Sequence, residues 1–321
     1  MPSSEFARGS TVAVRISTSV ILAFASVPTV KASSQLLERD FAGVAAAYSI
    51  TPNLTYHRAS GIDLKLDVYR PRESSSPNPT LMYIHGGGWT NGNKESSSLA
   101  FLPYLKMGWS VVNVSYRLAE VAHAPAAVED ARCALRWIYR NAEEYGFDRE
   151  TIVVTGNSAG GHLALTTGML TEADGLDAQC PGDRMRNWDA GPRNIAPLKV
   201  AAIVNWYGIT DIIDLLDNGP GSSGNFTEAW LGSSAIHRDT ANRVSPIELI
   251  KADSPPILTI HGTNDTIVPY AHGLRLHNFL NEAGVPNQLV TIEGGGHGGF
   301  SVREMQSIFD RIQGFLAQYV L

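Results

Sequence analysis

The feature that most constrains the fold is an alternation of short apolar runs with longer amphipathic segments from about residue 80 onward. We expect strands at the apolar runs, which lie at 80–86, 109–117, 151–156, 200–208, 256–262 and 287–294. Helical periodicity falls between them, near 95–107, 125–145, 159–170, 270–284 and 302–319. Strands that are apolar throughout and separated by helices are typical of a mainly parallel central sheet with helices on both faces. The sequence therefore predicts an α/β fold.

The remaining segments add detail to this prediction. Residues 54–59 and 63–71 flank a glycine, as an opening antiparallel pair of strands would. Residues 172–198 and about 214–245 are rich in Gly, Asp, Asn and Ser, and we expect loops or small lid-like insertions there because neither has enough apolar residues for its own core. With 321 residues and 44% hydrophobic content, the chain can bury one large core, so we assign residues 33–321 to a single domain.

Residues 1–32 have the layout of a secretory signal peptide. Two arginines precede the apolar stretch 16–30, and Val30 and Ala32 stand where a small-residue cleavage site requires them. The stretch is too short and too interrupted to span a bilayer, and no other segment is long and apolar enough to do so. A docked or disordered N-terminal arm is the alternative. We expect a secreted or periplasmic protein.

The charge of the chain disfavours two classes of partner. Its net charge of −6 argues against nucleic acid and against an anionic membrane surface, since either would favour a basic face. No metal-ligand spacing stands out in the sequence. We therefore expect neither a metal nor an organic cofactor.

The two cysteines are candidates for a disulfide. On the helix expected over 125–145, Cys133 falls almost opposite the main apolar face, beside Trp137, which suggests that another segment covers this side. Cys180, in a loop-like stretch, is an available partner, and an oxidising compartment would let the pair close. We predict a Cys133–Cys180 disulfide, with two unpaired thiols as the alternative.

The segment GNSAG (156–160) is the first sign of catalytic chemistry. It matches G-x-S-x-G and lies between an apolar strand and a helix, which is the context that a nucleophile elbow needs. The sharp turn would hold Ser158 in a strained backbone geometry, and the N-terminus of the following helix would stabilise negative charge beside it. A plain tight turn is the alternative interpretation. The context favours Ser158 as a nucleophile.

A second segment, HGGGW (85–89), also follows a predicted strand. Consecutive glycines let the backbone approach a reacting carbonyl and offer N–H groups to its developing oxyanion. A flexible loop is the alternative. Together with the serine elbow, the segment predicts an oxyanion hole formed by the N–H groups of Gly87, Gly88 and Ala159.

The base that would activate the serine is predicted to be His297. It lies in the glycine-rich loop EGGGHGGF between the last strand and the last helix, which gives it the reach to meet the serine. Other histidines within or beside regular elements have a ready structural role: His57, His85 and His162. Four lie on loops or helix surfaces and are expected to be exposed: His123, His237, His272 and His277. His261 ends a strand just before the acid candidate.

The acid that would orient the base is predicted to be Asp265, which follows the strand 256–262. Its rival, Asp211, lies one strand earlier and is more simply a helix N-cap. The chain order Ser158, Asp265, His297 is the order expected of α/β-hydrolases.

From about residue 50 to the C-terminus the chain resembles the α/β-hydrolase superfamily. Within it, the chain is similar to hormone-sensitive-lipase-type carboxylesterases and to bacterial feruloyl and acetylxylan esterase-like (BD-FAE-like) enzymes, which share the HGGGW and G-x-SAGG pair. Further similar stretches are VSYRLA (114–119), WYGITD (206–211), SPIELI (245–250) and HGTND (261–265). Many relatives carry an acidic residue before the serine, where this chain has Asn157. The resemblance implies an α/β-hydrolase fold and acyl-transfer chemistry.

These observations predict two-step ester hydrolysis through an acyl-enzyme on a small-molecule or polysaccharide-linked ester. No Arg or Lys lies within the site motifs, which favours neutral esters. Trp89, Trp206 and Tyr207 lie at predicted strand ends, where they would stack on a phenolic acyl group or a sugar, with ordinary packing as the alternative. We favour a feruloyl or acetylxylan-type esterase. The alternatives are a general short-acyl esterase or lipase, a polyester hydrolase, a peptidase or amidase on the same fold, and a non-catalytic binding protein.

Overall fold

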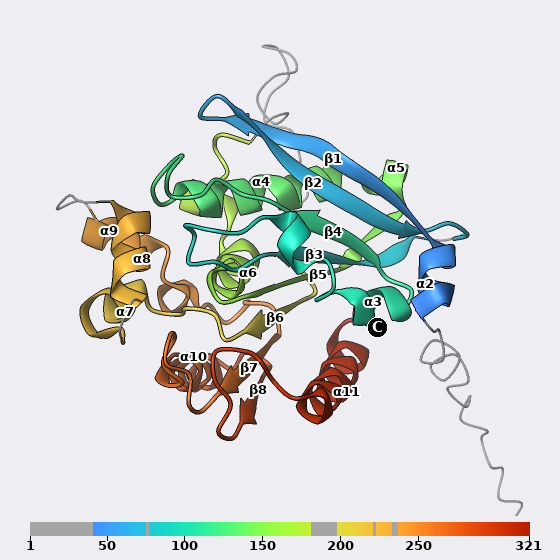
Figure 1. Ribbon diagram of the computed structural model, residues 1–321. Helices are drawn as coiled ribbons and strands as arrows, with labels where there is room; N and C mark the ends of the chain where they lie inside the picture. The colour runs from blue at the N-terminus through green and yellow to red at the C-terminus, as the bar shows by residue number, and fades with distance from the viewer. Residues whose placement is uncertain (1–40, 75–76, 181–197, 221–222, 233–236) are drawn as a thin grey trace, which may run out of the picture.

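The structure is a computed structural model and describes residues 41–74, 77–180, 198–220, 223–232 and 237–321 (Figure 1). The predicted signal peptide, residues 1–32, lies outside the described residues, as do most of the first expected insertion and the start of the domain assigned to 33–321.

The centre of the fold is an eight-stranded sheet with the order β1-β2-β4-β3-β5-β6-β7-β8. Its strands are β1 (Tyr48–Ala59), β2 (Ile62–Pro71), β3 (Asn78–Ile84), β4 (Ser110–Val114), β5 (Phe147–Asn157), β6 (Ala202–Trp206), β7 (Ile257–Gly262) and β8 (Asn287–Ile292). The expected antiparallel pair is β1–β2, and β2 also pairs antiparallel with β4. From β4 to β8 every pairing is parallel. The predicted mainly parallel sheet is confirmed.

Helices cover both faces of this sheet (Figure 1). One core contains buried side chains of α4, α6 and α10, and the other contains those of α3 and α11. The described helices are α2 (Phe41–Ala47), α3 (Leu102–Lys106), α4 (Ala126–Arg140), α5 (Ala142–Tyr145), α6 (Ala159–Met169), α7 (Ile212–Asn218), α8 (Ser223–Leu231), α9 (His237–Arg243), α10 (Ala271–Glu282) and α11 (Val302–Tyr319). Short 3₁₀ turns are η1 (Lys94–Ser97), η2 (Glu172–Asp174) and η3 (Pro246–Leu249). In the described part of the chain, no helix has the length and apolar character needed to cross a membrane.

The second expected insertion, 214–245, is more ordered than its composition indicated. It contains α8, α9 and most of α7, which lie together at one edge of the molecule (Figure 1). Trp230 of α8 is completely buried, and its ring stacks on that of Trp89 with the centroids 4.1 Å apart. Tertiary contacts of this kind stabilise short helices whose intrinsic helix propensity is too low to keep them folded.

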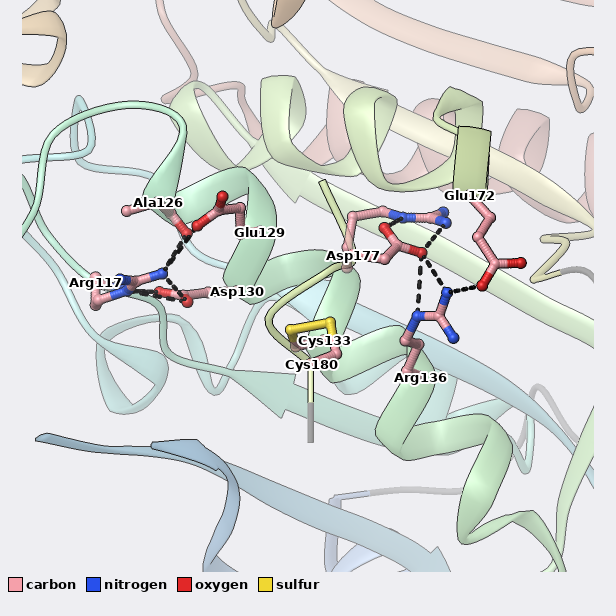
Figure 2. Close-up of a disulfide and its surroundings, with 10 residues drawn as sticks. Arg117, Ala126, Glu129, Asp130, Cys133, Arg136, Glu172, Asp177 and Cys180 are labelled. Carbon is pink, nitrogen blue, oxygen red and sulfur yellow. Dashed lines mark hydrogen bonds and ion pairs between the residues drawn. A yellow bond between two sulfur atoms is a disulfide. The ribbon is translucent and has the colours of Figure 1, made fainter. Parts of the chain in front are cut away.

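Helix α4 is buried on nearly all sides, and this corrects the expectation that Cys133 turns away from the core. The Cys133 side chain is completely buried. The segment up to Cys180 covers it, and the structure joins the two cysteines in a disulfide (Figure 2). Beside the disulfide, Asp177 accepts hydrogen bonds from Arg132 at 2.7 and 2.8 Å and from Arg136 at 2.9 Å. Burial raises the pKa of Asp177, but these two guanidinium groups outweigh burial and hold it below its usual value.

Candidate active site

Ser158 lies at the turn between β5 and α6, at the carboxyl edge of the parallel strands. Its backbone has φ 56° and ψ −122°, a combination that a residue with a side chain adopts only when its surroundings impose it. Two backbone hydrogen bonds do so: the Ser158 N–H donates to Trp206 O at 2.9 Å, and the Ser158 carbonyl accepts from the N–H of His162 at 3.0 Å. The serine is thus fixed from both the sheet and the helix.

The glycines around Ser158 are required by close backbone approach. A Cβ on Gly160 would lie 2.2 Å from the carbonyl oxygen of Ile84, at the end of β3. A Cβ on Gly156 would lie 2.4 Å from Gly160 O. Both distances are far below van der Waals contact, so α6 reaches the ends of the strands only because these positions carry no side chain.

The structure brings the three predicted catalytic side chains into one hydrogen-bonded chain. His297 Nε2 lies 2.8 Å from Ser158 Oγ, and His297 Nδ1 lies 2.7 Å from Asp265 Oδ2. A carboxylate only accepts hydrogen bonds, so His297 Nδ1 carries the proton and donates to Asp265. The lone pair of Nε2 then faces the serine hydroxyl. This tautomer suits a base that takes the serine proton.

Asp265 is held as an anion. Its Oδ1 accepts the backbone N–H groups of Ile267 and Val268, both at 2.9 Å. Burial raises its pKa, but contacts with His261 and His297 and these backbone hydrogen bonds outweigh burial and hold the pKa well below its usual value. The carboxylate is therefore ionised at any pH at which a neutral imidazole can act as the base.

The rival acid, Asp211, has the expected capping role. It is the N-cap of α7, and its side chain accepts from the N–H of Asp214 at 2.9 Å. The carboxylate that contacts His297 is that of Asp265.

The HGGGW segment follows β3, and its backbone at two positions is one that glycine adopts most readily. Gly87 and Gly88 have φ of 115° and 58°, and a Cβ on Gly87 would lie 2.1 Å from Asn91 O. Ala159 is the first residue of α6, so its N–H has no partner within the helix. His85 supports the loop: its ring stacks on Tyr116 with the centroids 4.3 Å apart, and burial lowers its pKa to about 4, which keeps it neutral.

Of the three aromatic residues predicted to contact substrate, Trp89 does not. Its side chain is completely buried, against Trp230 and His162. It packs in the core, which was the alternative interpretation.

The other two, Trp206 and Tyr207, line a cavity of about 570 Å³. This cavity also reaches Asn157, which precedes the serine, and Tyr207 lies edge-on to His297 with the ring centroids 4.7 Å apart. Its remaining walls come from Tyr83, residues 95–100, Tyr104, the loop 298–300, and Met305 and Phe309 of α11.

Sequence reasoning missed several features of the site and its surroundings. His272 and His277 were expected to be exposed, but both are buried, with 0% and 5% of their surface accessible. Asn157 accepts a hydrogen bond from the hydroxyl of Tyr83 at 3.1 Å, a partner that lies 74 positions away. His261 lies beside Asp265. The two residues are four positions apart, on either side of the end of β7, and this short spacing was the signal in the sequence for their contact.

No cluster of side chains suited to hold a metal ion occurs among the residues that the structure describes.

Comparisons with known proteins extend this picture. A family model described as BD-FAE matches residues 66–280, more than half of the chain. Esterase LipC of Mycobacterium tuberculosis is 29% identical over 208 residues, which are 64% of this chain and 49% of LipC. The probable carboxylic ester hydrolase LipM of the same organism is 32% identical over 212 residues, 64% of this chain and 46% of LipM. The chain thus spans about half the length of these curated relatives.

Among solved structures, a truncated form of a carbohydrate esterase from gut microbiota matches with a TM-score of 0.66 and 27% identity, covering 84% of this chain and 97% of that one. The predicted resemblance and fold are confirmed. The chain belongs to the BD-FAE family and has an α/β-hydrolase fold.

Proposed function

We propose that the protein is a serine carboxylesterase that hydrolyses neutral carboxylic esters. The observation that carries the proposal is the chain of contacts from Ser158 Oγ through His297 to Asp265, at 2.8 and 2.7 Å. A hydroxyl, an imidazole and an ionised carboxylate in this order form a proton relay that activates the hydroxyl as a nucleophile. The esterase names of the relatives support the same reaction class.

The reaction proceeds in two steps. Ser158 Oγ forms a bond to the ester carbonyl carbon as its proton passes to His297 Nε2, and Asp265 stabilises the imidazolium. The N–H groups of Gly87, Gly88 and Ala159 bind the oxyanion, where losing one such donor typically costs about 10²–10³ in kcat. The tetrahedral intermediate collapses, and the leaving alkoxide takes the proton from His297. A water molecule, deprotonated by the same imidazole, then releases the acid and restores the serine.

We infer that the ester joins an aromatic or acetyl group to a polysaccharide. Two features support this finer proposal: the aromatic walls of the 570 Å³ cavity, which suit a planar ring or a sugar, and the name of a structural relative, a carbohydrate esterase. The expected export of the chain fits such extracellular substrates. The cavity walls carry one carboxylate, that of Glu95, and no Lys or Arg, consistent with a neutral ligand.

A substrate panel tests both levels of the proposal. Initial rates are measured on 4-nitrophenyl esters of increasing acyl length, methyl ferulate and acetylated xylan, with the Ser158→Ala variant beside the wild type. We expect hydrolysis of the esters by the wild type and a loss of at least about 10³ in the variant. An arylamide of matched acyl group should react far more slowly than its ester. Full activity of Ser158→Ala would refute the reaction class, and activity on simple esters alone would refute the substrate.

A further inference from the structure

A second imidazole lies beside the catalytic carboxylate. His261, the penultimate residue of β7, places its Nε2 3.4 Å from Asp265 Oδ2, the oxygen that also accepts from His297. The same Nε2 lies 2.9 Å from the carbonyl oxygen of Val268. One ring nitrogen thus faces both a side-chain and a backbone oxygen of the loop that carries Asp265.

These partners define the tautomer of His261. Val268 O only accepts hydrogen bonds, so Nε2 carries the proton and donates to it. The same nitrogen lies 3.4 Å from Asp265 Oδ2, so its N–H is also close to the carboxylate. The other nitrogen, Nδ1, is buried and has no hydrogen-bond partner in the described part of the chain. The side chain is completely buried.

The surroundings leave the ring little freedom to move. Tyr270 lies edge-on to it with the centroids 5.7 Å apart. Gly273 of α10 lies behind it: a Cβ at that position would be 3.0 Å from His261 Nδ1. The titratable groups that face His261 are Asp265, Tyr270 and His272, which lies close enough for its own pKa to respond to His261.

We propose that His261 is a positioning residue for the catalytic acid. Its N–H spans the loop between β7 and α10 and directs Asp265 Oδ2 toward His297, while the N–H groups of Ile267 and Val268 hold Oδ1. His261 thus acts through Asp265 and lies outside the relay of Ser158, His297 and Asp265. The inference rests on the proposed esterase function.

Two variants with side-chain amides of different length test this role. In His261→Gln, the side-chain amide can place an N–H at the position of Nε2, whereas in His261→Asn the shorter side chain places it near Nδ1. We expect His261→Gln to keep kcat within about threefold of the wild type and His261→Asn to lose about 10- to 100-fold in kcat with little change in KM, since a misplaced acid weakens the transition state rather than substrate binding.

The pH profile separates positioning from general stability. Without the N–H of His261, Asp265 Oδ2 is no longer held against His297 Nδ1, so the carboxylate stabilises the imidazolium less. The acid limb of kcat/KM should therefore move to lower pH in His261→Asn and stay in place in His261→Gln. Gly273→Ala provides a variant that leaves every side chain of the relay intact: its methyl group pushes on the His261 ring, and we expect a fall of a few fold in kcat.

The outcomes distinguish this inference from the proposed function. An active wild type with an inactive Ser158→Ala, but with unchanged kcat and acid limb in His261→Asn, would overturn the role of His261 alone. Should His261→Asn fail to fold, an unchanged kcat in Gly273→Ala or a loss in His261→Gln as large as that expected for His261→Asn would do the same. An inactive wild type would instead contradict the esterase proposal.

Discussion

Gly160 is a residue at which the chain leaves no room for a side chain. A Cβ added to Gly160 would lie 2.2 Å from the carbonyl oxygen of Ile84 and 2.5 Å from that of His85. Neither backbone oxygen can move unless the end of β3 moves with it. We expect Gly160→Ala to lower the free energy of unfolding by about 1–3 kcal/mol, as overpacking of a core does, and to reduce kcat because the HGGGW backbone beside Ser158 shifts. Urea unfolding and kcat on one 4-nitrophenyl ester measure both effects.

Gly314 provides the matched control for that variant. It lies inside α11, and a Cβ there meets nothing within 4 Å. Gly314→Ala should raise the free energy of unfolding by about 0.5–1 kcal/mol through helix propensity and leave kcat unchanged. Equal effects of the two substitutions would contradict the close approach of α6 to the strands.

The low pKa of Asp265 predicts the form of the acid limb. Because the carboxylate stays ionised well below the usual range, Asp265 does not gain a proton as the pH falls from 7 to 5. We expect log kcat/KM of the wild type to fall with a slope approaching one over this range, and activity to return fully on raising the pH. A limiting slope of two would mean that the carboxylate titrates there as well.

At the scale of elements, the disulfide ties η2 and its flanking chain to α4. Its cysteines are 47 positions apart, and closing a loop of that length stabilises a protein by about 2–4 kcal/mol. We expect Cys133→Ala/Cys180→Ala to lower Tm by roughly 3–7 °C. Reductant should lower the Tm of the wild type and leave that of the double variant unchanged. A wild-type Tm that reductant does not change would contradict the disulfide.

The sequence predicted the strands well because they are apolar on both faces. Strands β4, β6, β7 and β8 fall within the expected ranges, β3 starts two residues before its range, and β5 extends from four residues before to one residue after its range. Ser158, His297 and Asp265 were identifiable because each lies in a short motif at a strand end, and parallel strands bring such ends to one edge of a sheet.

What the sequence did not predict depends on tertiary contacts. Helices α7 to α9 lie in a stretch that resembles a loop in composition, and the burial of Trp230 supports them. The sequence does not show that Trp89 stacks on Trp230, and this contact buries the side chain and excludes it from substrate contact. His272 occupies a helix start that looks exposed in sequence, but its ring is covered because Thr210 packs against it and donates its N–H to His272 Nδ1 at 3.2 Å.

At the scale of the whole molecule, buried neutral histidines predict sensitivity to acid. Burial lowers the pKa to about 4 in four of them: His85, His162, His272 and His277. In the unfolded chain their pKa is about 6.5, so between pH 6.5 and 4 the unfolded state binds more protons. The free energy of unfolding should be highest above pH 6.5 and fall toward pH 4.

Urea unfolding at pH 7.5, 5.5 and 4.5 measures this loss. Each such histidine contributes up to about 1.4 kcal/mol per pH unit within the window. His277→Gln, which keeps a polar side chain beside Asn287 but cannot titrate, should show a shallower loss than the wild type. Equal stability at pH 7.5 and 4.5 would contradict the burial of these rings.

The molecule as a whole brings three distant loops to one edge of its sheet: the turn after β5, the loop after β7 and the loop after β8. The account depends on the claim that this assembly makes the Ser158 hydroxyl a nucleophile. Rapid acid quenching of the wild type with excess 4-nitrophenyl acetate, followed by peptide mass spectrometry, tests that claim directly. We predict one acetyl group on the peptide that contains Ser158, and none in His297→Ala quenched at the same time. Release of 4-nitrophenol at the wild-type rate with no acetyl group on Ser158 would contradict it.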